Sequence, residues 1–274
     1  MKITNWATQL FHTVPLQQEH TVDGDAIRSL TIDAHTADVE LRSGTGSDLT
    51  AVLSGAVSES VYDGIHLDVL WEREDALAIR VRMDTKRMIG FNSLHLAVAI
   101  PDRLYETIRV HILTGDLEAQ NLRAHSLDLT TNTGDLVVGS CQADTCLVRT
   151  ITGEVEVKGQ PRDLQVEATT GDVTIDADCQ KLYARVVTGD INVRLKQTPE
   201  STSISCVTGD AYVHLATEPD ALTINLATVI GSVHAQTATL GASNGKRRWS
   251  AASGSGGPQM TVHCTTGDIE FSSG

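Results

Sequence analysis

The repeating unit of this chain is typified by the stretch Val166-Glu167-Ala168-Thr169-Thr170-Gly171-Asp172-Val173-Thr174-Ile175. Apolar and polar residues alternate on both sides of its central Thr-Gly-Asp tripeptide, which is typical of strands with one buried face. Glycine can adopt a positive φ without a Cβ clash, and Asp and Thr side chains can hydrogen-bond their own backbone in a turn. The stretch therefore predicts two short strands joined by a tight corner.

The tripeptide, or a near copy of it, recurs along the second two thirds of the chain. Successive copies are 18 to 22 residues apart, except for a last step of 268 − 232 = 36 residues, which is twice 18. Ser232 holds the acidic position of one copy, and the other predicted corner residues are Gly115 and Asp116, Gly134 and Asp135, Gly153 and Glu154, Gly171 and Asp172, Gly189 and Asp190, Gly209 and Asp210, and Gly267 and Asp268.

Apolar residues also recur at fixed distances from each corner. They lie one and three positions after the acidic residue and six and eight positions before it, as Val155, Val173 and Ile191 do in the first of these columns. One repeat, termed a coil, cannot bury its apolar face alone, so coils must stack at about 4.8 Å. We predict an all-β fold, a β-solenoid of stacked coils of 18–20 residues, in which those three side chains form one row.

The domain organisation follows from where this template holds. We expect an N-terminal segment (1–24), a β section continuous with the solenoid (25–108) and the repeat solenoid itself (109–274). Leu30 to Leu41 reproduce the template once within the β section. Ile65–Trp71 and Ala76–Arg82 predict a hairpin, and Leu94–Ile100 predicts a further strand. The Gly- and Ser-rich stretch 241–258 is predicted to be a loop; the alternative is a coil that has lost its corner motif.

Composition excludes several classes of partner. The formal charge is 21 − 35 = −14, which disfavours phosphate backbones, so we expect no nucleic acid. No segment approaches the roughly 18 apolar residues of a membrane span, and Met1–Val14 lacks the apolar core of a signal peptide. We therefore expect a soluble, cytoplasmic protein. The run Lys246-Arg247-Arg248 is interpreted as a solvated loop.

Five cysteines without a Cys-x-x-Cys motif favour a reducing compartment and structural thiols over a disulfide framework. Cys146, Cys206 and Cys264 fall in inward columns, where cysteine acts as a small apolar residue. Because Cys206 and Cys264 are 264 − 206 = 58 residues apart, we expect them on coils that are not adjacent.

The acidic residues that follow the corner glycines form a column along the stack. Such a column resembles calcium sites in which oxygen ligands come from adjacent turns. The calcium-binding nonapeptide carries several glycines per turn, whereas each coil here has one. We interpret the corner acids as turn caps and predict no metal and no cofactor, with calcium left as an alternative. The sequence contains no His-Glu-x-x-His, Gly-x-Ser-x-Gly or phosphate-binding loop, so we predict no catalytic residue.

Several stretches of the chain carry a resemblance to a known family. They are Ala99-Ile100-Pro101-Asp102, Leu113-Thr114-Gly115-Asp116-Leu117, and the closing Gly254-Ser255-Gly256-Gly257 with Thr266-Gly267-Asp268-Ile269. They resemble the bacterial domain of unknown function 4097 (DUF4097), a family of β-strand repeat-containing proteins also known as candidate adhesins. The resemblance covers residues 25–274 and implies a right-handed β-helix-like fold without known catalysis. In some Gram-positive members it implies a link to cell-envelope stress or to surface interactions.

These observations favour a non-catalytic structural or interaction module. Its partner would be a protein or an envelope polymer, or a second copy bound through the unpaired strand edges of the end coils. The alternative is a carbohydrate-active β-helix enzyme, which needs carboxylates clustered in a groove. A hexapeptide-repeat acyltransferase is excluded, since its apolar residues would recur every six positions on three faces.

Overall fold

The computed structural model describes residues 12–84 and 92–274 of the 274-residue chain, and most of them lie in β-strands. Among the described residues the one helix is α2 (Glu59–Tyr62). Residues 1–11 of the expected N-terminal segment lie outside the described part. The chain divides into two compact units, residues 1–134 and 135–274, and each is described by itself.

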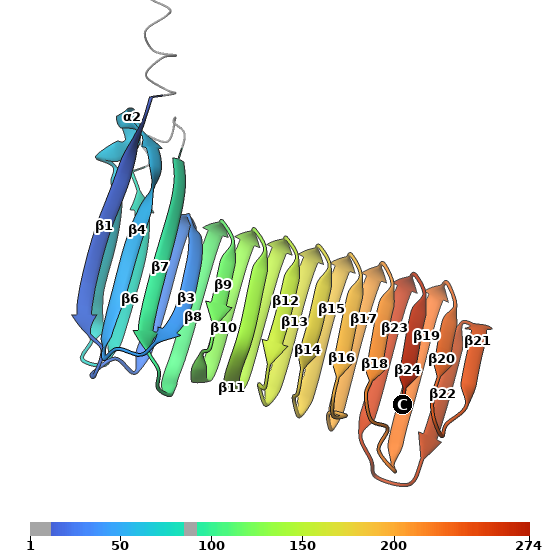
Figure 1. Ribbon diagram of the computed structural model, residues 1–274. Coiled ribbons are helices and arrows are strands. Elements are labelled where there is room, and N and C mark those ends of the chain that lie inside the picture. Colours follow the sequence, from blue (N-terminus) through green and yellow to red (C-terminus); the bar gives the residue numbers. More distant parts are fainter. Residues whose placement is uncertain (1–11, 85–91) are drawn as a thin grey trace, which may run out of the picture. The chain divides into compact units, whose positions relative to one another are not determined.

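Unit 2 is a stack of coils with two faces (Figure 1). Strands that lead into a corner form the entry face, and strands that leave it form the exit face. The entry face contains the second half of β11 (Leu136–Thr152), β13 (Asp163–Thr170), β15 (Lys181–Thr188), β17 (Ser201–Thr208), β23 (Gln259–Thr266) and β19 (Leu222–Ile230). The exit face contains the first half of β11, β12 (Val155–Gly159), β14 (Val173–Ala177), β16 (Ile191–Leu195), β18 (Ala211–Leu215), β24 (Ile269–Ser273) and β20 (Val233–Gln236).

The predicted rows are confirmed. Val155 pairs in parallel register with Val173, and Val173 with Ile191, and all three side chains are buried. Because every coil repeats the same inward columns, stacking places Val, Ile, Leu, Ala and Cys side chains directly over one another between the two faces. The chain is an all-β protein with a β-solenoid fold.

The C-terminal coil does not follow its predecessor in space. β23 pairs in parallel with β17 on one side and with β19 on the other, and β24 pairs likewise with β18 and β20. The last coil of the sequence is therefore inserted between two earlier coils. Cys206 consequently lies opposite Cys264 on a neighbouring strand, so the expectation that these cysteines are not adjacent was wrong. Equivalent columns let any coil pair with any other, whatever their separation in sequence.

The stretch 241–258 forms strands instead of the loop expected there. β21 (Ala242–Lys246) pairs antiparallel with β20, and β22 (Arg248–Ser253) pairs antiparallel with β19. The chain thus reverses at this end of unit 2 and covers the last parallel coil with two antiparallel strands (Figure 1). β21 and β22 each have a neighbouring strand on one edge. Such end strands need few large apolar residues, so their Gly and Ser residues did not prevent pairing. The basic run of residues 246–248 lies exposed where β21 gives way to β22.

Unit 1 repeats this plan of parallel coils and adds antiparallel strands, which form the pairs β5–β6, β1–β4 and β4–β7. Its entry face runs β5–β6–β2–β8–β10 and its exit face runs β1–β4–β7–β3–β9. The strands are β1 (Thr13–Asp23), β2 (Ser29–Thr36), β3 (Asp38–Gly44), β4 (Asp48–Ser58), β5 (Ile65–Arg73), β6 (Ala76–Met83), β7 (Asn92–Pro101), β8 (Tyr105–Thr114), β9 (Leu117–Gln120) and β10 (Arg123–Thr133). The β5–β6 hairpin, the strand ending at Pro101 and the early coil of β2 and β3 confirm the predictions made for these segments.

Glycine is required at the corners by both conformation and space. Gly189 has φ = 137°, in the region that L side chains rarely adopt. A Cβ on Gly189 would lie 2.2 Å from the carbonyl oxygen of Gly171 in the neighbouring coil, and one on Gly209 would lie 2.1 Å from that of Gly189. Backbone oxygens of the stack cannot move aside one at a time, so these glycine corners exclude a side chain. In the coil of β2 and β3 the equivalent position is held by Ala37.

We predict that Gly189→Ala lowers the free energy of unfolding by at least about 3 kcal/mol, because it combines strain at positive φ with a backbone clash. Gly256→Ala is the matched control: its φ is 75° and nothing lies within 4 Å of a Cβ there. Conformational strain alone should cost it about 1–2 kcal/mol. Urea unfolding followed by circular dichroism measures both, and equal losses in the two variants would contradict the stacked corner.

Candidate functional site

The corner acids of unit 2 form a ladder of hydrogen bonds that runs along the stack. The backbone N–H of Asp190 donates to Oδ1 of Asp172 at 2.8 Å, and that of Asp210 donates to Oδ1 of Asp190 at 2.8 Å. The N–H of Asp268 then donates to Asp210 at 2.7 Å, and that of Ser232 donates to Asp268 at 2.8 Å. Each carboxylate therefore caps the next coil, whereas the sequence suggested that it would cap its own turn.

The remaining predicted corner residues occupy equivalent places. Gly115, Gly134, Gly153, Gly171, Gly209 and Gly267 all have φ between 133° and 145°. In unit 1 the N–H of Asp116 donates to Asp38 at 3.0 Å, and in unit 2 the N–H of Glu154 donates to Asp135 at 2.8 Å. In the parts of the chain that the structure describes, no group of three or more His, Cys, Asp or Glu side chains could hold a metal ion.

The ladder is interrupted at Glu154. Among the described hydrogen bonds, none joins the N–H of Asp172 to the Glu154 carboxylate. Glutamate has one methylene more than aspartate, which carries its carboxylate past the N–H that an Asp at this corner would reach. The coil at Glu154 is therefore tied to its neighbour less firmly than the coils that follow.

Replacing Glu154 by Asp should extend the ladder. We expect a gain of about 1 kcal/mol in the free energy of unfolding, because one more exposed N–H gains a charged acceptor. Glu156→Asp, which shortens an outward side chain two positions along β12, should change stability by less than about 0.5 kcal/mol. Urea midpoints of the two variants decide the matter, and no gain at position 154 would contradict this account of the ladder.

Ser232, His234 and Asp268 meet at the end of the ladder. The Ser232 hydroxyl lies 3.0 Å from Oδ1 of Asp268 and 3.0 Å from Nε2 of His234. In a Ser-His-Asp triad the histidine lies between the other two and accepts the serine proton. Here the serine is in the middle and its hydroxyl donates to the carboxylate, so the three residues close the ladder and do not form a nucleophilic triad.

The same contacts perturb the Asp268 carboxyl. The backbone N–H and hydroxyl of Ser232 hold the pKa of Asp268 below its ordinary value of 3.8. A lowered pKa in the folded state means that the ionised carboxylate stabilises the fold above pH 3.8 and that this contribution is lost as pH falls through the folded-state pKa.

We therefore expect Asp268→Asn to lower the urea midpoint at pH 7 and to approach the wild-type value as the pH falls below 3.8. Asp220→Asn removes an exposed acid outside the ladder, and it should leave the midpoint nearly unchanged at both pH values. A deficit of Asp268→Asn that stays constant down to pH 2 would show that charge at this corner contributes nothing.

Four of the five cysteines are buried, and these four form two neighbouring pairs. Hydrogen bonding between the Cys206 and Cys264 thiols lowers the pKa of Cys206 and raises that of Cys264, and contact with Cys146 lowers the pKa of Cys141. Burial raises the pKa of Cys179 to about 12. These thiols sit among apolar side chains, as the inward columns predicted for Cys146, Cys206 and Cys264.

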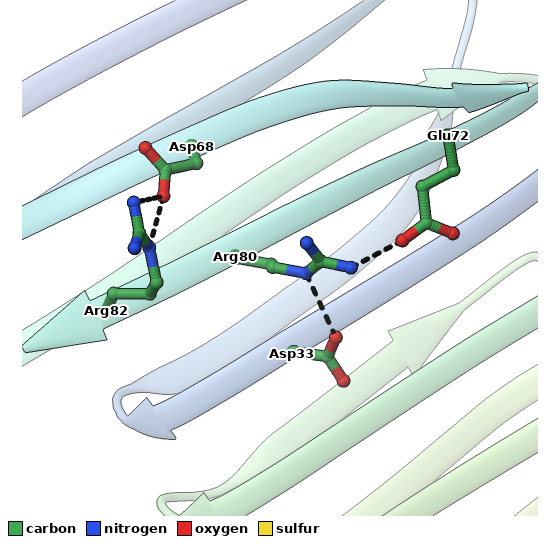
Figure 2. A network of polar contacts seen from close by, with 5 residues as sticks. All are labelled: Asp33, Asp68, Glu72, Arg80 and Arg82. Carbon is green, nitrogen blue, oxygen red and sulfur yellow. Dashed lines mark hydrogen bonds and ion pairs between the residues drawn. The ribbon is translucent and has the colours of Figure 1, made fainter.

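Unit 1 carries a network of ion pairs on its entry face (Figure 2). Arg80 of β6 pairs with Glu72 of β5 and, at 3.6 Å, with Asp33 of β2, while Arg82 pairs with Asp68. The hydrogen bond from Arg82 holds the pKa of Asp68 below its usual range. Charges of opposite sign thus neutralise one another here, which leaves little free charge to recognise a ligand.

The exit face of unit 2 instead carries a groove of about 680 Å³. It lies over four adjacent strands, β16, β18, β24 and β20, with Asn244 of β21 at its end. Parallel register aligns its outward side chains in two rows: Asn192, Tyr212, Glu270 and His234, and Arg194, His214, Ser272 and Gln236. The sheet beneath holds these side chains on a rigid floor.

Half of the polar side chains in these two rows are uncommitted, and His234 is bound to the Ser232 hydroxyl. His214 is 2.9 Å from the Ser272 hydroxyl, and the Tyr212 hydroxyl donates to Asp210 at 3.3 Å. Within the described residues, no side-chain hydrogen bond or ion pair occupies Asn192, Arg194, Gln236 or Glu270. Sequence reasoning missed this site, because Glu270 and Ser272 join it only through the insertion of the C-terminal coil.

Stacked coils, a corner ladder and an outward groove define a non-globular β-repeat module. The chain belongs to the Toastrack DUF4097 family, whose model matches residues 27–272. No curated protein sequence matches it. Among the helices of the described part, none has the length and apolarity needed to cross a membrane.

Solved structures that resemble the chain share little sequence with it. A candidate lipid-binding protein from Parabacteroides distasonis is 10% identical, with a TM-score of 0.52, and 94% of this chain and 96% of that one are covered. A candidate adhesin from the same organism is 11% identical, with a TM-score of 0.51 and coverage of 94% and 97%. A candidate adhesin from Bacteroides fragilis is 14% identical, with a TM-score of 0.44 and coverage of 94% and 97%.

Proposed function

We propose that the chain is a non-catalytic binding module that holds a glycan polymer of the cell envelope in the exit-face groove of unit 2. The observation that carries this proposal is the groove itself, whose volume of about 680 Å³ lies in the range of ligand sites. Its amides, imidazoles, carboxylate and guanidinium have the mixed donors and acceptors that sugar hydroxyls require. The name of one structural relative, the candidate adhesin from Parabacteroides distasonis, agrees with an envelope role.

Tyr212 is the aromatic platform of the groove. Its ring is 36% exposed and stands in the middle strands, between Asn192 on one side and Glu270 on the other. An aromatic face provides apolar contact area at low entropic cost, while the flanking amide and carboxylate fix orientation. A long polymer fits such a floor because each coil adds two outward side chains in register with those of its neighbours. The polar lining disfavours an acyl chain.

Binding without cleavage is favoured by the carboxylates of the groove. Glycoside hydrolysis uses two carboxyl groups that flank the scissile bond. Glu270 is the one acidic residue among the described residues that line the groove. A second carboxylate would have to come from the corner column, where Asp210 and Asp268 already accept backbone hydrogen bonds.

We expect Tyr212→Ala to weaken binding of soluble peptidoglycan fragments at least tenfold in isothermal titration calorimetry, because the stacking platform is lost. Tyr183→Ala is the matched control, since Tyr183 is 37% exposed on the entry face. Equal binding by both variants and the wild type would refute the proposal that the glycan binds in the groove. Release of reducing sugar that stops in Glu270→Gln would instead establish the alternative, a carbohydrate-active enzyme.

A further inference from the structure

The outer edge of β22 is an unpaired strand edge at the end of unit 2. β22 pairs with β19, and no other strand of the described chain pairs with it. The N–H of Thr228 donates to the carbonyl of Arg247 at 2.9 Å, so the backbone of residue 247 faces β19. Backbone groups alternate in direction along an antiparallel strand, and those of Arg248, Ser250 and Ala252 therefore face away from β19.

This edge lacks the protection found on the edge strand of unit 1. There, the Gln18 side chain takes the place of a neighbouring strand beside β5: its amide donates to the carbonyl of Ile65 at 2.9 Å and accepts from the N–H of Leu67 at 2.7 Å. β5 also carries charged residues at positions 68, 72 and 73. Charges and side-chain caps of this kind keep exposed edges from pairing. β22 has Arg248 as its one charge and no proline.

We infer that β22 pairs antiparallel with β22 of a second copy of the chain, about a two-fold axis at Ser250. Two-fold antiparallel pairing places each residue opposite a fixed partner, so the strand must be complementary to itself. Centred on Ser250, the pairing sets Arg248 opposite the second copy's Ala252 and brings no like charges together. Their outward N–H and C=O groups bond each other across the axis.

The inward side chains of β22 are complementary in size in the same register. Trp249 lies opposite the second copy's Ala251, so the largest side chain of the strand meets one of the smallest. Trp249 is half-buried beside Leu226 within one copy, and a second strand covers it further. Large–small pairs of this kind are favourable cross-strand neighbours.

Exposed apolar residues gather on the coil that β22 covers. The corner position held by Thr208 and Thr266 in the two preceding coils is held by Ile230, which is 61% exposed, and Val229 beside it is also exposed. Val229 is not peculiar to this coil, since Val207 holds the same column in a neighbouring coil and Ile151 is exposed at the equivalent position of an earlier one. Threonine at the corner position suits permanent contact with water, whereas Ile does not. This coil is thus adapted to an environment that its neighbours do not share.

Because pairing closes on itself, the product is a dimer and not a filament. Antiparallel pairing of β22 with itself uses the free edge of both copies, so no second β22 edge remains for a third chain. The dimer presents two exit-face grooves, which would raise the avidity for a polymer with many equivalent sites. The interface itself is independent of the proposed glycan binding, since β22 lies outside the groove lining.

Light scattering coupled to size exclusion tests the dimer on the full chain. The wild type should have twice the mass of the 29.3 kDa chain and dissociate on dilution. Ser250→Pro removes an N–H that β19 does not use, so it should fold and be monomeric. Ser250→Ala keeps that N–H and should remain dimeric.

A second variant keeps the test decisive if proline perturbs folding. Ser250→Asp places two carboxylates opposite each other only in the proposed register, and it should weaken dimerisation at least tenfold. Circular dichroism melts show whether each variant is folded. A wild type that is monomeric at every concentration, or a folded Ser250→Asp variant that dimerises like the wild type, would overturn the inference.

Discussion

Successive corners of the stack approach one another so closely that this contact sets the register of every coil. A Cβ on a corner glycine would lie about 2 Å from the carbonyl oxygen of the corner residue in the preceding coil of the stack, so the backbones meet there without any intervening side chain. The acid that follows reaches across to the N–H of the next corner. Backbone contact and side-chain cap together allow one register only. Since strand side chains alternate with period two, a slip of one residue would turn every buried Val and Ile outward.

This constraint explains why so much of the fold could be predicted from the sequence. The Thr-Gly-Asp spacing predicted the coils, and the columns around it predicted the row of Val155, Val173 and Ile191 that the structure contains. The order of the coils could not be predicted. Every coil offers the same columns to its neighbours, so pairing energy does not distinguish the sequential order from one in which the last coil is inserted. The wrong expectation that Cys206 and Cys264 lie on coils that are not adjacent follows from this equivalence of the coils.

The candidate site was harder to predict because it is made by neighbours in space. Nothing in the sequence placed Glu270 between Tyr212 and His234, or Ser272 between His214 and Gln236. The corner acids show the opposite case. Their positions were evident from the repeat. Their role differs from that of a local turn cap, because each carboxylate accepts a hydrogen bond from a backbone N–H of the next coil.

Both units place a terminal coil inside the stack and close their ends with antiparallel strands. A coil stabilises a solenoid through its two neighbours, so an end coil with one neighbour is the least stable position. In unit 1 the early coil of β2 and β3 has neighbours on both sides, as the coil of β23 and β24 does in unit 2. The antiparallel strands at the ends take the less stable position with one neighbour, and they carry the exposed edges. There the units differ: unit 1 covers β5 with the Gln18 amide, whereas among the described residues β22 has no such side-chain cap and carries Arg248 as its one charge. An edge left without protection in a chain that protects another is best explained by a partner that pairs with it.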